Sequence, residues 1–205
     1  MEITPQLVKE LRERTGAGMM DCKRALEEAD GDLERATELL RSRGLADAAK
    51  RSGRVAAEGL VEAYIHMQGS LGVLVELNCE TDFVAKTDDF RALARDVAMQ
   101  IAATAPRWIA RDEVPDDVID GERKVFEEQA RQEEKPEDVI PRIVDGKLEA
   151  FYREAVLLDQ PWVRDDSVTI GEMISQASAK LGEKIEVGRF ARFKVGEATQ
   201  SEEGD

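Results

Sequence analysis

A strand pattern and a helix pattern meet in the middle of this chain, and the four residues that join them fit neither. Residues 71–79 are apolar and rich in β-branched side chains, which predicts a half-buried strand. Residues 88–104 carry apolar side chains at helical spacing, which predicts a helix. The connection contains Thr81, Asp82, Phe83 and Val84. A large ring such as that of Phe83 either folds back onto the core or is held out for a partner, and the residues alone leave both placements open.

The first 44 residues predict a domain of three short helices. Thr4 precedes Pro5 as a cap before a proline at the first helical position, and Asp32 caps the third helix, which is expected to end at Gly44. Helices this short are marginal alone, so we expect them to pack on one another. Residues 45–57 are small and basic, which suits a linker helix.

Residues 58–198 predict a core domain in which strands alternate with helices. A β-hairpin is expected over residues 59–79 and a closing strand over 184–195, with a further helix over 170–181. A helical hairpin is expected at about 115–156, with a kink or a shorter second arm because of Pro141 and Gly146. The polar tail 199–205 is expected to be disordered.

These patterns together predict an α+β fold. It consists of the N-terminal three-helix domain, followed by a three-stranded antiparallel sheet packed by helices, with the helical hairpin as an insertion.

The formal charge of −15 belongs to the larger part of the chain. Residues 1–55 hold 11 Lys+Arg and 11 Asp+Glu, so residues 56–205 carry all of the net negative charge. A body this acidic repels phosphate backbones, so we expect no direct nucleic-acid binding. The basic segment 41–54 runs against this trend and is interpreted as a solvated connector.

Neither a membrane segment nor a cofactor site is expected. The apolar runs are strand-sized, and the first residues lack the features of a signal peptide, so we expect a cytoplasmic protein without membrane contact. Cys22 and Cys79 are too few for a closed zinc site and are interpreted as buried, reduced thiols. No glycine-rich phosphate loop follows any strand. We therefore expect no cofactor, no metal and no small-molecule substrate.

Catalysis of covalent chemistry is not expected. The single histidine, His66, lies in a predicted strand and is interpreted as a structural or surface residue. Acidic clusters fit solvated faces, and nothing in their spacing selects a hydrolytic pair, so a carboxylate hydrolase is the weakest interpretation. Met19 and Met20 are more informative, because both cannot face a small three-helix core. Either one of them is a core residue and the other an incidental surface residue, or the pair contacts a partner.

Three segments of the chain resemble the bacterial elongation factor Ts family. Residues 7–23, LVKELRERTGAGMMDCK, look like its N-terminal signature, and residues 78–86, NCETDFVAK, look like a second one. Residues 147–162 are similar to the stretch after the family's helical hairpin. The segments lie in the same order, and the resemblance covers residue 1 to about residue 197. The first domain is also similar to a ubiquitin-associated three-helix fold, which by itself indicates only a binding module.

The resemblance implies a function and a set of contact residues. The family is the guanine-nucleotide exchange factor for elongation factor Tu, the GTPase that carries aminoacyl-tRNA to the ribosome. Similarity implies that Asp82 and Phe83, within the segment 81–84, press into the GTPase near the Mg²⁺ of its nucleotide and dislodge it. On this basis Phe83 is interpreted as an inserted anchor rather than a core residue. The N-terminal contact surface implied by the resemblance comprises Arg12, Met19, Met20 and Lys23.

One departure from the family pattern bears on the oligomeric state. Long family members carry two similar core halves, whereas this chain has room for one, and short members pair two chains, which implies a homodimer. Leu71 and Gly72 match an apolar–Gly pair of the second half, and Gln100 stands where that half has a histidine, so these three are expected at the contact surface of the second subunit. The alternative to an exchange factor is a non-exchanging, chaperone-like adaptor built around the ubiquitin-associated-like domain.

Overall fold

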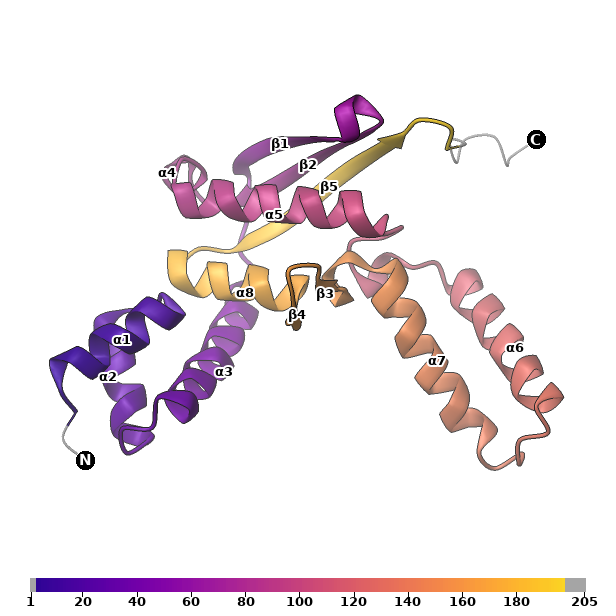
Figure 1. Ribbon diagram of the computed structural model, residues 1–205, viewed down its shortest axis with the longest axis horizontal. Coiled ribbons are helices and arrows are strands. Elements are labelled where there is room, and N and C mark those ends of the chain that lie inside the picture. Colours follow the sequence, from indigo (N-terminus) through magenta and orange to yellow (C-terminus); the bar gives the residue numbers. More distant parts are fainter. Residues whose placement is uncertain (1–2, 198–205) are drawn as a thin grey trace. The chain divides into compact units, whose positions relative to one another are not determined.

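A computed structural model describes residues 3–197, and the predicted α+β class is confirmed (Figure 1). The predicted tail at residues 199–205 lies outside the described residues. No helix in the described part of the chain is both long and apolar enough to cross a membrane. The elements in chain order are α1 (Pro5–Thr15), α2 (Met19–Glu28), α3 (Leu33–Arg51), β1 (Glu58–His66), η1 (Met67–Gly69), β2 (Leu71–Cys79), α4 (Asp82–Ala85), α5 (Asp88–Thr104), η2 (Arg111–Glu113), α6 (Asp116–Gln132), α7 (Ile140–Ala155), η3 (Leu157–Asp159), β3 (Pro161–Trp162), β4 (Asp165–Thr169), α8 (Ile170–Leu181) and β5 (Ile185–Lys194).

The chain divides into two compact units. Unit 1 comprises Met1–Glu62, Glu76–Ala94 and Glu172–Gly188, and unit 2 comprises Ala63–Val75, Arg95–Gly171 and Arg189–Asp205. The division passes through β1, β2, α5 and β5. It therefore does not follow the predicted limits at residues 44 and 58, and each unit contains part of the sheet.

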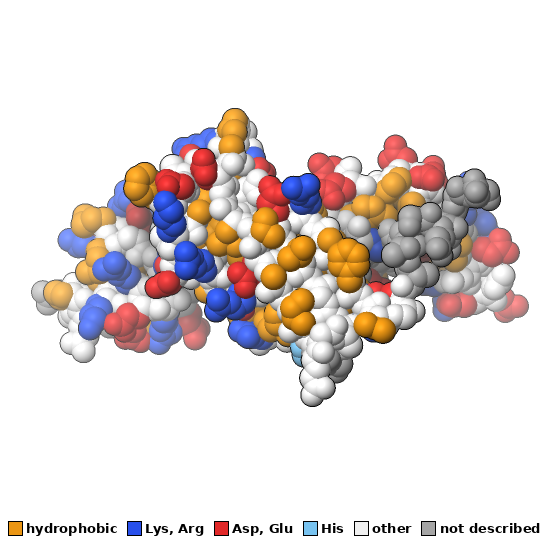
Figure 2. All heavy atoms as spheres, turned by 90° about the horizontal axis from the view of Figure 1, so that it is seen from above, with side chains coloured by type: hydrophobic (Ala, Val, Ile, Leu, Met, Phe, Trp, Pro, Cys, Tyr) orange, Lys and Arg blue, Asp and Glu red, His pale blue; other side chains and the backbone are white. Residues whose placement is uncertain are grey.

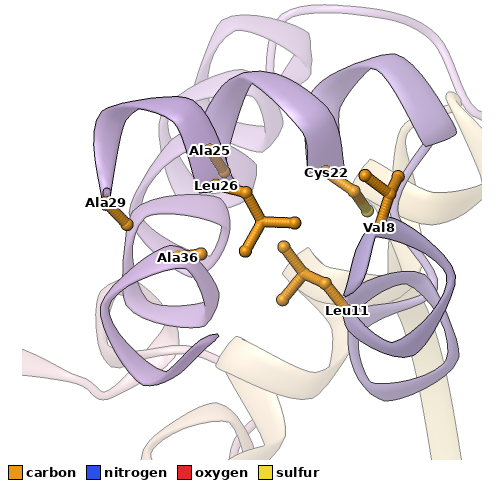
Figure 3. Close-up of a cluster of buried hydrophobic side chains, with 7 residues drawn as sticks. All are labelled: Val8, Leu11, Cys22, Ala25, Leu26, Ala29 and Ala36. Atoms are coloured by element: carbon orange, nitrogen blue, oxygen red, sulfur yellow. The ribbon is translucent and has the colours of Figure 1, made fainter. Parts of the chain in front are cut away.

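The three N-terminal helices of unit 1 enclose a small apolar core. Thr4 accepts a hydrogen bond from the amide of Leu7 at 3.3 Å, and Asp32 accepts two from the first turn of α3 at 2.9 and 3.1 Å, so both predicted caps are confirmed. Burial of each large apolar side chain contributes about 1.5–3 kcal/mol, which holds together helices that are marginal alone. Figure 3 shows the buried side chains pointing toward one another: Val8, Leu11, Cys22, Ala25, Leu26, Ala29 and Ala36.

The third helix is longer than the sequence predicted. It does not end at Gly44 but continues to Arg51, so it absorbs about half of the predicted linker 45–57. Gly44 lacks the positive φ of a C-cap glycine. A Cβ at Gly44 would lie 3.3 Å from the Cβ of Ala179 in α8, so this glycine permits the close approach of two helices rather than ending one.

Within the described residues, β1, β2 and β5 form a three-stranded antiparallel sheet with β2 at its centre. The connection of residues 67–70 between β1 and β2 is too short for anything but antiparallel pairing. Alternate side chains of β2 are buried, which the predicted half-buried strand requires, and α5 runs along the sheet (Figure 1). The buried side chains of β2 and α5 include Val73, Val75, Leu77, Cys79, Phe90, Leu93, Val97 and Ile101.

In unit 2, α6 and α7 pack side by side as the predicted helical hairpin (Figure 1). Their shared core contains Ala130, Ile140, Val144 and Leu148. Of the two expected outcomes for the second arm, a kink or a shorter arm, the shorter arm is found. Because α7 begins at Ile140, Pro141 lies in the first helical turn, where its missing N–H leaves no bond unmade.

Arg111 joins the second arm of the hairpin to the segments beside it in unit 2. Its guanidinium donates to both carboxylate oxygens of Glu149, at 2.9 and 2.8 Å, and to Asp159 at 2.8 Å. It also lies over the ring of Tyr152, 4.5 Å from the centroid. The bidentate contact with Arg111 holds the pKa of Glu149 below its usual value. A network of this kind is more stabilising than an isolated surface ion pair.

Gly59 provides a direct test of the packing between β1 and β2. Its φ is +153°, and an added Cβ would lie 2.2 Å from the carbonyl oxygen of Leu77. We expect Gly59→Ala to lower the free energy of unfolding by about 2 kcal/mol or more, because backbone must move to admit the methyl group. Gly146→Ala is the matched control, since nothing lies near its added Cβ within α7. It should raise stability by about 0.5–1 kcal/mol, because alanine is the better helix former. Urea unfolding of the two variants measures both effects, and equal stabilities would contradict the assigned contact.

Candidate functional site

The segment Thr81–Val84 forms most of a single helical turn, α4, between β2 and α5. Thr81 has extended backbone angles, φ −134° and ψ 153°, and its hydroxyl accepts a hydrogen bond from the amide of Val84 at 3.4 Å. Within this turn the side chains of Val84 and Ala85 are buried, whereas those of Asp82 and Phe83 point outward. The phenyl ring of Phe83 is 79% exposed. The placement of Phe83 on the core is therefore wrong.

Two glutamates from opposite sides of the turn hold its start in place. The carboxylate of Glu183 accepts hydrogen bonds from the amides of Glu80, at 3.1 Å, and Thr81, at 3.0 Å, and from the hydroxyl of Thr81 at 2.6 Å. Glu80 returns the contact, because its carboxylate accepts from the amide of Lys184 at 2.6 Å. These bonds begin where the hydrogen-bond ladder between β2 and β5 ends. Beyond that point, side-chain carboxylates accept the hydrogen bonds of the backbone amides in place of backbone carbonyls.

The charges around the turn support the same arrangement. The amide of Lys184 and, less strongly, the guanidinium of Arg54 hold the pKa of Glu80 below its usual value, so Glu80 is a carboxylate at neutral pH. Asp82 forms an ion pair with Lys86 one helical turn later. Beneath the turn, the Sγ of Cys79 donates to the carbonyl of Thr81 at 3.1 Å, and burial raises the pKa of this thiol. The turn is thus held by hydrogen bonds on its inner side while Phe83 stays outside.

The predicted N-terminal contact residues are all exposed on α1 and α2 of unit 1. Met19, Met20 and Lys23 are spaced so that they share one side of α2, and both methionines are exposed, by 43% and 66%. Lys23 pairs with Glu27 at 3.7 Å. Arg12 is exposed in the last turn of α1. Of the two interpretations of the methionine pair, the one that places one of them in the core is wrong.

Gly72 lies in an open apolar groove of unit 2 with a volume of about 480 Å³. A Cβ on Gly72 would lie 3.2 Å from Cδ1 of Ile65, so glycine makes room for that side chain. The groove is also lined by Leu74, Phe193 and Val195, which are exposed by 48%, 65% and 79%. In Figure 2 hydrophobic side chains gather next to one another on the displayed face. Leu71 is half-buried and does not line the groove.

Gln100 is fully buried in unit 2, so its expected place on a contact surface is wrong. Its amide nitrogen donates to Gln160 and to the carbonyl of Pro161, both at 3.1 Å, and its oxygen accepts from the amide of Val163 at 2.9 Å. Thr104 completes the network by donating to Gln160 at 2.6 Å. These bonds hold β3, which pairs with β4 in a small antiparallel sheet that the sequence did not predict. A buried amide with its bonds satisfied is a structural residue.

His66 is exposed, as one of its predicted placements requires. Its ring stacks on Tyr64 with centroids 5.8 Å apart, and Nδ1 lies 2.9 Å from the hydroxyl of Tyr64. Among residues 3–197 no group of three or more His, Cys, Asp or Glu side chains is arranged to hold a metal ion.

Glu80 and Glu183 are the residues that sequence reasoning missed. They are 103 positions apart, and each looks like one of the 44 Asp and Glu residues of the chain. Glu183 has one weak local signal, because it follows Gly182, whose φ of +79° ends α8 before β5 begins. The partners of the two carboxylates follow only from the tertiary structure.

Comparisons with known proteins agree on one family. The family model described as "Elongation factor TS" matches residues 46–197. The chain is 58% identical over 197 residues to elongation factor Ts of Fervidobacterium nodosum, covering 96% of this chain and 100% of that protein. It is 56% identical over 203 residues to elongation factor Ts of Carboxydothermus hydrogenoformans, covering 99% and 94%. Elongation factor Ts of an Anaeromyxobacter species is 56% identical over 202 residues, covering 98% and 92%.

Labelling of Cys79 should report whether the turn above it is closed. Cys79 and Cys22 are both fully buried, and burial raises the pKa of each thiol above its ordinary value of 9.0. Since only the thiolate reacts, we expect iodoacetamide to label each cysteine at least about tenfold more slowly in the folded protein than in urea. A raised pKa also means that the thiolate fraction is still increasing at pH 9, so both rates should continue to rise above that pH. Peptide mass spectrometry separates the two sites. Equal labelling of Cys79 in folded and unfolded protein would contradict the closed turn.

Proposed function

Because this chain belongs to the elongation factor Ts family, a family of translation elongation factors, we propose that it is a guanine-nucleotide exchange factor that binds elongation factor Tu and accelerates the release of GDP. It acts by contact and not by covalent catalysis, so it is not an enzyme. Its place of action is the cytoplasm, and its partner is the GTPase itself rather than a nucleic acid.

The exposed ring of Phe83 is the observation that carries this proposal. A phenylalanine that is 79% exposed forgoes about 1.5–3 kcal/mol of burial in the free protein. Binding recovers that energy if the ring enters an apolar pocket of the partner. The adjacent carboxylate of Asp82 lies on the same outer side of the turn. In the proposed complex this pair reaches the GTPase near the Mg²⁺ of its nucleotide and disturbs the coordination of the metal.

The effect on GDP follows from linkage between two binding equilibria. A factor that binds the empty GTPase more tightly than the nucleotide-bound form must weaken nucleotide binding by the same ratio. Mg²⁺ is bound jointly by the nucleotide phosphates and the protein, so its displacement mainly increases the dissociation rate of GDP. To promote GDP release, Phe83 therefore needs to bind the empty GTPase more tightly than the nucleotide-bound form.

A second contact is proposed for the three-helix part of unit 1. Met19 and Met20 present flexible, polarizable side chains to solvent beside Lys23, and Arg12 adds a further cation. Such a surface suits an apolar patch of a partner that is rimmed by acidic groups. In the proposal it supplies affinity, whereas the turn that carries Phe83 supplies the effect on the nucleotide.

Replacement of Phe83 by alanine tests the proposed function. We expect Phe83→Ala to reduce the stimulation of GDP release about 30-fold or more, which corresponds to about 2 kcal/mol for a buried anchor. The free energy of unfolding should change by less than about 0.5 kcal/mol, because the side chain is exposed. Release of labelled GDP from elongation factor Tu is the measurement. Val163→Ala, which truncates another exposed apolar side chain, is the control and should leave the rate unchanged.

The same assay separates the proposal from the adaptor alternative. An adaptor that binds elongation factor Tu without exchange would leave GDP release at the rate of the GTPase alone. A Phe83→Ala protein with full activity would refute the role of the ring, even if the wild type stimulates release.

We further propose that the chain acts as a homodimer through the apolar groove of unit 2. The resemblance to short family members implies two paired chains, and the groove offers the required surface. The only charged side chain among its lining residues is Lys194, in a chain whose net charge is −15. Two such acidic chains repel each other, and contact between surfaces rich in carboxylates adds to this repulsion. The apolar groove, which has no carboxylate among its lining residues, is therefore the favoured region of contact. Packing of one sheet face on another is a common way to bury such surfaces.

A charge placed in the groove should separate the proposed dimer. Leu74→Glu would put two like charges into the contact and should raise the dimer dissociation constant at least about 100-fold. Val125→Glu is the matched control, because Val125 lies on α6 and is 49% exposed, compared with 48% for Leu74. Sedimentation velocity over a range of concentrations measures both constants. A wild type that sediments as a monomer at every concentration, or a Leu74→Glu protein that dimerises normally, would contradict the assignment.

A further inference from the structure

Glu183 joins the turn between α8 and β5 to the segment in front of Phe83 by three hydrogen bonds, whereas Glu80 joins the two by one. It is half-buried, and both of its carboxylate oxygens are engaged. One oxygen accepts from the two successive amides of Glu80 and Thr81, and the other accepts from the hydroxyl of Thr81. The backbone carbonyl of Glu183 in turn accepts from the hydroxyl of Ser178 at 2.5 Å, which fixes the residue to α8.

These contacts fall on the two residues that decide where Phe83 points. Thr81 is the cap of the single turn α4, and its hydroxyl both donates to Glu183 and accepts from the amide of Val84. The hydrogen bonds at the amides of Glu80 and Thr81 restrict the φ and ψ angles of these residues. Because each residue has only these two soft dihedrals, the restriction limits the direction in which α4 starts. A four-residue helical turn cannot maintain itself without such support.

We propose that Glu183 is a positioning residue for Phe83. Its carboxylate holds the backbone at Glu80 and Thr81 so that the ring points outward in the orientation that acts on the partner. Glu183 does this without touching the partner. The inference rests on the proposed function, which it extends by a residue outside the segment 81–84.

The contacts of Glu183 make its effect separable from that of general stability. The three bonds that its carboxylate accepts come from one segment, Glu80–Thr81, whereas Cys22 lies in the apolar core of the three-helix part. Loss of the carboxylate should therefore expose Cys79, whose Sγ lies under the carbonyl of Thr81, and leave Cys22 protected. The two cysteines of the native chain serve as probe and control. Because the charge of Glu183 also raises the pKa of Cys79, hydrogen exchange at Glu80 and Thr81 decides whether faster labelling reflects an opened turn.

The experiment compares Glu183→Ala with Glu186→Ala in the full-length protein. Glu186 is a nearby acid of β5 whose carboxylate pairs with the ammonium group of Lys184 at 2.7 Å, so its loss removes the same charge without removing a hydrogen bond of Glu80 or Thr81. We expect Glu183→Ala to speed iodoacetamide labelling of Cys79 and hydrogen exchange of the amides of Glu80 and Thr81 by about tenfold or more, with Cys22 unchanged. Stimulation of GDP release should fall about tenfold, because the ring is no longer held in place. Glu186→Ala should match the wild type in all three measurements.

Two further variants distinguish positioning from a general structural role. Glu183→Gln keeps an oxygen acceptor for the amides and should restore part of both the protection of Cys79 and the exchange activity; it also decides the question if Glu183→Ala does not fold. In a Phe83→Ala background, Glu183→Ala should cause a smaller loss of exchange activity than it causes in the wild type, since the ring is gone and only Asp82 is left to be positioned.

Each result either supports or overturns the inference. Unchanged labelling of Cys79 in the Glu183 variants overturns it, as does a loosened turn with full exchange activity, or an additive loss in the Phe83→Ala background. Failure of the proposed function looks different: the wild-type protein itself would then not stimulate GDP release, while hydrogen exchange at Glu80 and Thr81 still shows whether Glu183 holds the turn.

Discussion

The carboxylates of Glu80 and Glu183 accept backbone hydrogen bonds where β2 ends and β5 begins, just before the chain turns into the helix α4. Backbone amides just beyond the end of a strand have no ladder partner, and leaving them unpaired costs about 1–3 kcal/mol each if they are buried. Here carboxylates replace the missing carbonyls, from Glu183 toward Glu80 and Thr81 and from Glu80 toward Lys184. The direction of α4 and the start of α5 both depend on these hydrogen bonds, because the two helices follow directly in the chain.

The turn α4 separates apolar side chains into an inner and an outer set within four residues. Val84 and Ala85 face the interior and anchor the turn, while Phe83 remains in water. The sheet repeats the same division on a larger scale, since the odd-numbered residues of β2 are buried from Val73 onward while Leu74 is exposed. In a chain with a net charge of −15, these few exposed apolar side chains are the surfaces on which association can gain free energy.

Gln100 shows that a family pattern does not by itself tell whether a side chain is exposed. The resemblance implies that Gln100 stands where a second core half has a histidine, and so predicts a contact residue. In this chain the side chain instead satisfies three hydrogen bonds in the interior and holds the short strand β3. A glutamine amide that is fully bonded inside a unit is not available to a partner, so the role expected from the resemblance does not carry over to this residue.

Local signals in the sequence determined those helices and strands in which the spacing of apolar residues indicates the buried face. The strand Leu71–Cys79 and the helices Asp88–Thr104 and Ile170–Leu181 were predicted with the bounds that the structure has, because apolar periodicity and capping act within a few residues. The same reasoning singled out Phe83 as a residue that fits neither pattern. Tertiary structure decided the rest: the exposure of that ring, the burial of Gln100, the continuation of α3 past Gly44, and the pairing of Glu80 with Glu183. Each of these depends on groups that are distant in the chain, and the energy of a hydrogen bond or a close contact exists only once folding has brought them together.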